Sequence, residues 1–148
     1  MQIKNKPSVK FNAHNMKVGL VVARFNQSTT QALLGSALAA LRDFKVKGPN
    51  IKVIEVAGCM EVPFALQSLA KSKKYGCLVA LGCVIRGETP HFDYVCKTAQ
   101  EGALRVSLDF HIPIGFGIIT VNNLKQAQAR GHLGGEAVAA AVELAKIG

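Results

Sequence analysis

The sequence contains no tryptophan, and its aromatic residues are seven phenylalanines and two tyrosines. A buried core must therefore consist mainly of Val, Ile, Leu and Ala, which fits an apolar fraction of 49%. Long apolar segments are missing too, because the longest run, CLVALGCVI at 77–85, is far shorter than the roughly 20 residues that cross a bilayer. Residues 1–16 are basic without an apolar stretch, unlike a secretory signal. We expect a cytoplasmic protein without membrane association.

Acidic residues are scarce, with nine Asp and Glu against 18 Lys and Arg, which gives a net charge of +9. This excess favours anionic partners, either nucleic acid or phosphorylated small molecules, although a basic solvated surface explains it as well. An RNA-binding domain would carry basic motifs interleaved with aromatic residues, as in RRM sheets, and the sequence has none. We therefore expect a phosphorylated small molecule, and no nucleic acid, as the partner.

The sequence also offers little for disulfide, metal or nucleotide chemistry. Its four cysteines include no CxxC pair, and Cys77 and Cys83 are roughly 20 Å apart if they share one strand. We expect reduced, buried thiols, as in cytoplasmic proteins. Cys59 lacks the later arginine of a cysteine phosphatase, and His132 with Glu136 lacks a third metal ligand nearby, so we predict no metal site. Neither GxGxxG nor a P-loop lysine is present.

Apolar runs and segments with helical spacing alternate along the chain, which predicts strands separated by helices. Continuously apolar strands favour a parallel sheet that is covered by helices on both faces. We therefore predict one α/β domain over residues 17–148, preceded by an N-terminal arm at 1–16. The predicted strands are 17–23, 50–58, 77–85 and 112–120, and the predicted helices are 28–44, 62–72, 92–111 and 124–147.

Local signals support some of these boundaries. Ser28 and Gln31 form a capping-box pattern at the start of the first helix, and Pro63 suits the first turn of the second. Three glycines, at 131, 134 and 135, interrupt the last helical segment.

Right-handed crossovers place the loops that follow the strands at one edge of the sheet, where ligands bind in such folds. The loop RGETPH (86–91) is the most unusual of them. Thr89 suits the N-cap of the next helix and Pro90 its first position, so free N–H groups there would form either an anion site or an ordinary helix start. His91 would lie in the first helical turn, as a proton carrier or a surface residue. Asp93 would not face it.

Two further loops contribute candidates. Phe25 follows the first strand directly, and it either stacks on a planar heterocycle or covers the helix below. Glu61 either accepts hydrogen bonds from ligand hydroxyls or stabilises the N-terminus of the next helix. For both Phe25 and Glu61, the sequence pattern leaves the two alternatives open.

Four motifs, in order, resemble the lumazine synthase family. They are VVARFN (21–26), VAGCMEVPFA (56–65), ALGCVIRGETPHFDYVC (80–96) and IPIGFGIIT (112–120). The third motif is long and specific, and the resemblance extends from about residue 16 to the end of the chain. It implies a flavodoxin-like, three-layer α/β/α sandwich with a four-stranded parallel sheet.

The resemblance also implies an activity. Members of the family condense 5-amino-6-(D-ribitylamino)uracil with 3,4-dihydroxy-2-butanone 4-phosphate and release phosphate and water. The product is 6,7-dimethyl-8-ribityllumazine, formed in the penultimate step of riboflavin biosynthesis. Members use no metal and no organic cofactor. A different flavodoxin-like enzyme would not be expected to share so long a third motif.

By the same resemblance, His91 transfers protons during imine formation and phosphate elimination. Phe25 stacks on the pyrimidine, and Glu61 holds the ribityl hydroxyls together with the backbone around Gly58 and Cys59. Phe116 and Arg130 match residues that reach the site from a neighbouring subunit, with Arg130 binding phosphate. The remaining substrate-binding positions are Val84 and Ile85 at the end of a strand and Glu88 and Thr89, whose backbone donates to the phosphate.

The family assembles as pentamers, which in some members pair as decamers or form shells of sixty subunits. We expect a homopentamer here, with decamer and shell as competing outcomes, and an arm at 1–16 that adds a strand to a neighbour. Leu133 stands where many members carry a lysine within a glycine-rich loop. This departure favours the alternative that the chain is an inactive member that binds flavin or lumazine or forms shells.

Overall fold

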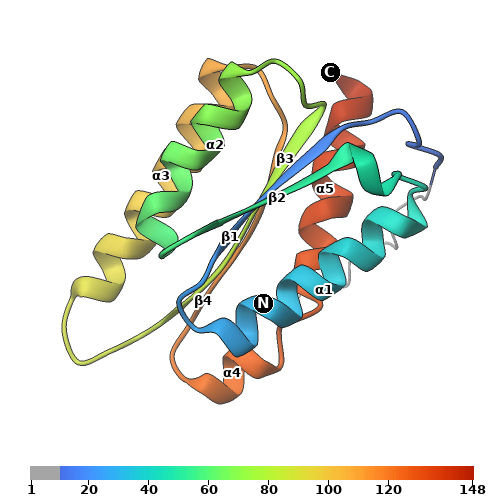
Figure 1. The fold of residues 1–148 in the computed structure, drawn as a ribbon. Coiled ribbons are helices and arrows are strands. Elements are labelled where there is room, and N and C mark those ends of the chain that lie inside the picture. The colour runs from blue at the N-terminus through green and yellow to red at the C-terminus, as the bar shows by residue number, and fades with distance from the viewer. Residues whose placement is uncertain (1–10) are drawn as a thin grey trace.

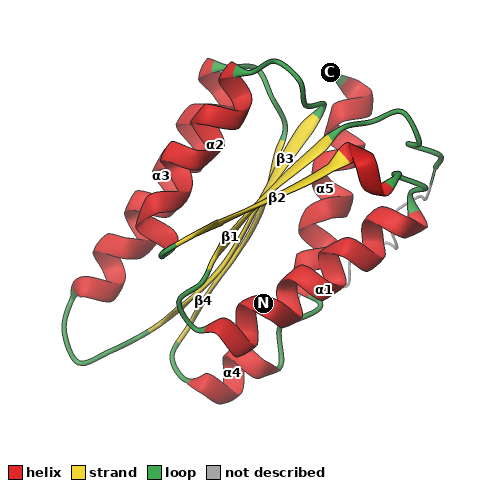
Figure 2. Ribbon diagram, viewed as in Figure 1, coloured by secondary structure: helices red, strands yellow, loops and turns green. Residues whose placement is uncertain are grey.

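Four strands pair side by side in the order β2-β1-β3-β4, and every pairing is parallel. They belong to a computed structural model that describes residues 11–148, so most of the predicted N-terminal arm (residues 1–10) lies outside the described residues. The strands alternate with helices as predicted (Figures 1 and 2). The strands are β1 (Val18–Ala23), β2 (Ile51–Val56), β3 (Cys77–Ile85) and β4 (Ile114–Val121), and the helices are α1 (Gln27–Asp43), α2 (Val62–Lys71), α3 (His91–Asp109), α4 (Leu124–Gln128) and α5 (Leu133–Ile147), with short 3-10 turns at η1 (Gly48–Asn50) and η2 (Cys59–Glu61).

The helices form two layers, one on each face of the sheet. Helices α1 and α5 cover one face and α2 and α3 cover the other, while α4 lies beside the carboxyl end of β4 (Figure 1). The predicted three-layer α/β/α sandwich is therefore confirmed. Because all strands are parallel, their carboxyl ends meet at one edge of the sheet, the lower edge in Figure 1.

The α1–α5 layer is closely packed. A Cβ atom built on Gly134 would overlap the carbonyl oxygen of Leu33, so the backbones of the two helices touch where Gly134 lies. Ser36 of α1 reinforces this contact, because its hydroxyl donates to the carbonyl oxygen of Gly131 at 2.7 Å and accepts from the N–H of Gly135 at 3.0 Å. The small residues of α5 thus allow a close approach that larger side chains would prevent.

The α2–α3 layer is packed on the inside but apolar on the outside. Gly102 of α3 lies against Pro63 of α2, where a Cβ atom would overlap the proline ring. Phe64 is 75% exposed and Leu108 is 71% exposed, and a groove of about 200 Å³ runs between these helices. This layer therefore leaves apolar surface uncovered in the single chain.

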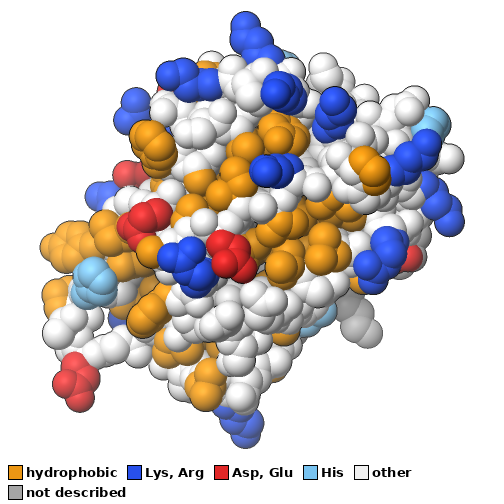
Figure 3. Space-filling model, viewed as in Figure 1, with side chains coloured by type: hydrophobic (Ala, Val, Ile, Leu, Met, Phe, Trp, Pro, Cys, Tyr) orange, Lys and Arg blue, Asp and Glu red, His pale blue; other side chains and the backbone are white. Residues whose placement is uncertain are grey.

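Burial along the strands differs from the expectation of continuous burial. Strand β1 is buried throughout and β3 nearly so, because both are central. Strand β2 lies at the sheet edge and is only half-buried or exposed, with Val53 38% exposed. The expectation was wrong for β2, and apolar side chains consequently appear among Lys and Arg side chains on the surface in this view (Figure 3).

Three local expectations were also wrong. Helix α1 begins at Gln27 after Asn26, which has a left-handed conformation (φ 63°), so Ser28 lies inside the helix and caps nothing. Helix α3 has Pro90 at the N-cap and His91 at its first position, whereas Thr89 was expected at the N-cap and Pro90 at the first position. The last segment forms two helices that break at residues 129–132, whereas glycines 134 and 135 lie inside α5, where they provide the contact with α1.

Candidate active site

A cavity of about 330 Å³ opens at the carboxyl edge of the sheet. It is lined by the loop after β1, the turn η2, the end of β3 and the start of α3, so the topology brings these loops together as predicted. The lining residues are Phe25, Asn26, Gly58, Cys59, Met60, Glu61, Cys83, Val84, Ile85, Gly87, Thr89, His91, Phe92 and Val95.

Buried thiols lie at the bottom of this cavity. The sulfur of Cys59 fills the space beside Gly82, where a Cβ atom would be only 2.5 Å away. Burial raises the pKa of the Cys59 thiol to about 12 and raises the pKa of Cys83 as well. Both groups are therefore protonated at neutral pH, and Cys59 is a poor nucleophile there. Cys59, Cys77, Cys83 and Cys96 are free thiols, as predicted, and Cys96 is only half-buried.

The loop after β1 presents an aromatic ring on a fixed backbone. The N–H of Phe25 donates to the carbonyl oxygen of Ala57 at 3.1 Å, which ties the loop to the segment after β2. The side-chain amide of Asn26 donates to the carbonyl oxygen of Cys83 at 2.9 Å, which ties it to β3. The Phe25 side chain itself is 71% exposed. A planar ligand can therefore stack on this ring without displacing a packed neighbour.

Glu61 ends the turn η2 and immediately precedes α2. Its carboxylate lies near Gly58, because a Cβ atom on that glycine would be 3.3 Å from Oε1. The N–H of Glu61 donates to the carbonyl oxygen of Gly58 at 3.2 Å and closes the turn. This carboxylate is exposed beside the cavity and can accept hydrogen bonds from hydroxyl groups.

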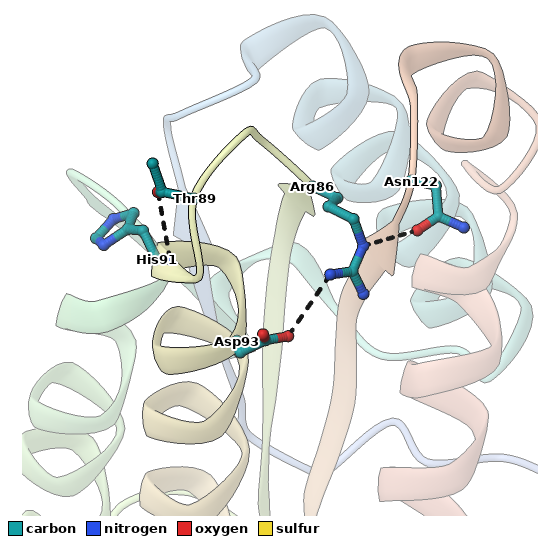
Figure 4. Close-up of polar contacts among 5 residues, drawn as sticks. All are labelled: Arg86, Thr89, His91, Asp93 and Asn122. Atoms are coloured by element: carbon teal, nitrogen blue, oxygen red, sulfur yellow. Dashed lines mark hydrogen bonds and ion pairs between the residues drawn. The ribbon is translucent and has the colours of Figure 1, made fainter.

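The start of α3, whose polar side chains are drawn in Figure 4, also lines the cavity. The hydroxyl oxygen of Thr89 accepts a long hydrogen bond, 3.4 Å, from the N–H of His91. The N–H groups of Glu88 and Thr89 form no hydrogen bond with other groups of residues 11–148. These donors and the helix dipole can therefore bind an anion. The side chain of Glu88 is exposed and does not line the cavity.

His91 and Asp93 do not form a relay, in agreement with the sequence spacing. Asp93 pairs with Arg86, with 3.8 Å between Oδ1 and Nη1, while the exposed His91 ring lies on the opposite side of the helix start (Figure 4). The imidazole is thus accessible to a ligand in the cavity.

Phe116 and Arg130 lie away from this cavity. They line a separate, open hollow of about 500 Å³ between β4 and α5, together with Leu133 and Glu136. Arg130 donates from Nη1 to the carbonyl oxygen of Gln126 at 2.8 Å. One chain therefore does not bring these two residues to Phe25 and His91.

Sequence reasoning assigned no role to several residues at the cavity. Asn26, Phe92 and Val95 line it, and Arg86 joins its wall to the loop after β4 through Asn122. The only signal for Arg86 and Asn122 was their position after neighbouring strands. Within residues 11–148, no helix is long and apolar enough to span a membrane, and no cluster of three or more His, Cys, Asp or Glu is placed to hold a metal ion.

Comparison with known proteins agrees with this geometry. The sequence model of the family described as 6,7-dimethyl-8-ribityllumazine synthase matches residues 15–148. The protein named 6,7-dimethyl-8-ribityllumazine synthase from Polaromonas sp. (strain JS666) is 43% identical over 139 residues, which cover 93% of this chain and 90% of that protein. The four motifs, the sandwich and the cavity lie within the matched region. This chain belongs to the 6,7-dimethyl-8-ribityllumazine synthase family.

Proposed function

We propose that this protein condenses 5-amino-6-(D-ribitylamino)uracil with 3,4-dihydroxy-2-butanone 4-phosphate to form 6,7-dimethyl-8-ribityllumazine. Family membership supports this reaction. The observation that carries it is a single cavity lined both by an exposed aromatic ring, Phe25, and by a helix start with free N–H groups and His91. A planar pyrimidine would fit the ring, and a phosphate ester would fit the helix start.

Each side of the cavity supports one part of the mechanism. The pyrimidine stacks on Phe25, and Glu61 with the backbone of Gly58 and Cys59 binds the ribityl hydroxyls. Val84 and Ile85 form the apolar wall at the end of β3. Much of the rate enhancement then comes from holding the aromatic amine against the ketone, because bimolecular encounter becomes an intramolecular step.

Proton transfer and phosphate release involve the start of α3. The amine attacks the ketone carbon, water leaves to form the imine, and the phosphate then leaves as a dianion. The ribitylamino nitrogen finally attacks the carbonyl carbon that this elimination generates, and a second water leaves as the ring closes. His91 accepts and returns the protons in these steps, since its exposed imidazole lines the cavity and imidazole is a general acid and base. The free N–H groups of Glu88 and Thr89 stabilise the phosphate.

A complete site would need a second subunit. Phe116 and Arg130 lie outside the cavity of their own chain, so we propose that they act in the cavity of a neighbour, where Arg130 binds the phosphate. The uncovered apolar surface of α2 and α3 is available for such contacts. We propose a homopentamer, with decamer or shell as the competing assemblies, located in the cytoplasm in keeping with the free thiols.

The described part of the arm packs on its own chain. Phe11 lies edge to face against Phe44, with ring centroids 5.3 Å apart, and the N–H of Ala13 donates to the carbonyl oxygen of Phe44 at 2.7 Å. The predicted addition of a strand to a neighbour falls mostly on residues 1–10, which lie outside the described residues.

The first experiment measures lumazine formation by absorbance and fluorescence from the two substrates. We expect product from the natural sequence, a lower turnover with little change in substrate binding for His91→Ala, and weaker use of the phosphorylated substrate for Arg130→Ala. Absence of product from a folded, oligomeric protein that still binds lumazine would favour the inactive alternative and direct attention to Leu133.

A mixing experiment tests the shared site. His91→Ala and Arg130→Ala chains are mixed in denaturant at equal amounts and refolded together. If each site takes His91 from one chain and Arg130 from the next, about one site in four contains both residues, and activity returns to about that fraction. No chain in the mixture carries both His91 and Arg130. If activity stays at the level of the separate variants, both residues therefore belong to the site of a single chain.

A further inference from the structure

A continuous chain of polar contacts connects the start of α3 to Arg130. Arg86 is its centre: Nε donates to Oδ1 of Asn122 at 3.1 Å, and Nη1 lies 3.8 Å from Oδ1 of Asp93 (Figure 4). Its guanidinium carbon also lies 4.4 Å from the ring centroid of Phe92, which lines the cavity. One side chain therefore contacts both the wall of the cavity and the loop after β4.

The series of polar contacts continues from Asn122 through α4. The N–H of Asn122 donates to Oε1 of Gln126 at 2.7 Å, and the N–H of Gln126 donates to the side chain of Asn123 at 2.9 Å. The carbonyl oxygen of Gln126 then accepts from Nη1 of Arg130 at 2.8 Å. Helix α4 has only five residues, so little intrahelical hydrogen bonding fixes its orientation. The contacts with Asn122 and Asn123 supply that orientation instead.

Stability does not explain this arrangement well. The side chains of Arg86 and Asp93 are 50% and 64% exposed, and exposed ion pairs contribute little to folding. A guanidinium that bonds one partner along Nε, pairs with another at Nη1 and covers an aromatic ring uses its planar shape, which a lysine cannot reproduce. The geometry is suited to fixing the relative positions of two segments.

We propose that Arg86 is a positioning residue that aligns two phosphate-binding elements belonging to adjacent sites. The first element is the start of α3 in its own cavity. The second is Arg130 of the same polypeptide, which Arg86 reaches through Asn122 and Gln126 and which acts in the neighbour's cavity. This inference rests on the proposed function and on the shared site. It assigns to Arg86 an effect on a site that its own side chain does not line.

The kinetic test uses Arg86→Gln and Arg86→Lys. We expect both variants to raise KM for the phosphorylated substrate about tenfold, because the displaced phosphate-binding groups bind the phosphate less tightly. KM for the ribitylaminouracil should change less than about twofold, since the Phe25 side of the cavity has no contact with Arg86. Arg105→Gln is the matched control, because Arg105 is also exposed and also pairs with an aspartate of α3, Asp109, at 3.9 Å. Equal effects from Arg105→Gln and Arg86→Gln, or full rescue by lysine, would overturn the positioning role.

The mixing experiment separates the two sites. Arg86→Gln is added to the His91→Ala chain, whose own site is already inactive and which contributes Arg130, together with Phe116, to its neighbour. We expect the activity restored by mixing with Arg130→Ala to show a clearly higher KM for the phosphorylated substrate. Restored activity with an unchanged KM would refute the link to Arg130. Failure of the parent mixture to restore any activity would instead refute the shared site, so the two failures are distinguishable.

Discussion

The two helical layers of this protein differ in how completely they bury their apolar residues. The α1–α5 layer brings two helix backbones into contact through glycines of α5 and the hydroxyl of Ser36. The α2–α3 layer is equally apolar on its inner side but leaves Phe64, Tyr94, Leu104 and Leu108 more than half exposed. The α1–α5 layer is the more complete one within a single chain, with exposed large apolar side chains at Leu144 and Ile147 near the end of α5. The α2–α3 layer has the surface expected of a subunit interface. The difference indicates which half depends on assembly.

Replacing Gly134 with alanine should have the largest effect on the complete layer. The new Cβ would overlap the carbonyl oxygen of Leu33 and force α1 and α5 apart, at a cost of about 3 kcal/mol in the free energy of unfolding. Gly35→Ala is the matched control, because a Cβ on Gly35 of α1 would meet no atom within 4 Å, and this variant should gain up to about 1 kcal/mol. Urea denaturation of both variants measures the difference. Similar values for the two would mean that the helices tolerate separation.

Phe64→Ser should test the open layer. Phe64 is 75% exposed, so the unfolding free energy of the single chain should change by less than about 0.5 kcal/mol. If other subunits cover this residue, assembly should weaken by about 30-fold in dissociation constant, as for a central aromatic contact. Sedimentation at several protein concentrations measures this. Ile147→Ser, at an 83% exposed position at the end of α5, is the control and should leave assembly intact. The comparison fails if Ile147→Ser dissociates the protein and Phe64→Ser does not.

The buried thiols give a smaller, pH-dependent test. Burial raises the pKa of Cys77, a β3 residue in the core beneath α1 and α5, from 9.0 to about 12. Above pH 9 the unfolded thiol ionises while the folded one stays protonated, so folding stability falls as pH rises, by about 1 kcal/mol per pH unit for this group. Cys77→Val should remove this part of the decrease in unfolding free energy between pH 8 and pH 10. Denaturation at both pH values measures the decrease. Replacing the half-buried Cys96 with serine should remove much less of this decrease in unfolding free energy. An alkaline loss that Cys77→Val leaves unchanged would contradict the raised pKa.

Sequence patterns predicted the parts of the fold that depend on burial. Strand β3 begins at Cys77 and ends at Ile85 as predicted, because a central strand covered on both faces must be apolar throughout. Strand β2 was harder, since its apolar residues do not reveal that it lies at an edge. Asn26 also escaped prediction: its left-handed backbone and its bond to Cys83 involve a partner 57 residues away.

The position of the cavity was predictable from the sequence, but the side-chain contacts that connect its wall to other segments were not. Parallel topology places Phe25, Glu61 and His91 at the same edge, so their proximity followed from the order of strands. The contact of Arg86 with Asn122 depends on the pairing of β3 with β4 and on side-chain rotamers, which leave no periodic signal. The placement of Phe116 and Arg130 outside the cavity agrees with what the family resemblance implied, whereas no periodic pattern in the sequence indicates it.

The close pairing of α1 with α5 has a consequence for synthesis on the ribosome. The contact between Ser36 and Gly135 spans 99 residues, so the side of α1 that packs on α5 stays uncovered until the last helix has been translated. At about 5–20 residues per second, this interval lasts roughly 5–20 s. The first helix to emerge thus completes its packing only after the last helix has emerged. Nascent chains of this protein are expected to need chaperone protection at Leu33 and Leu41, even though this layer is the more complete one after release.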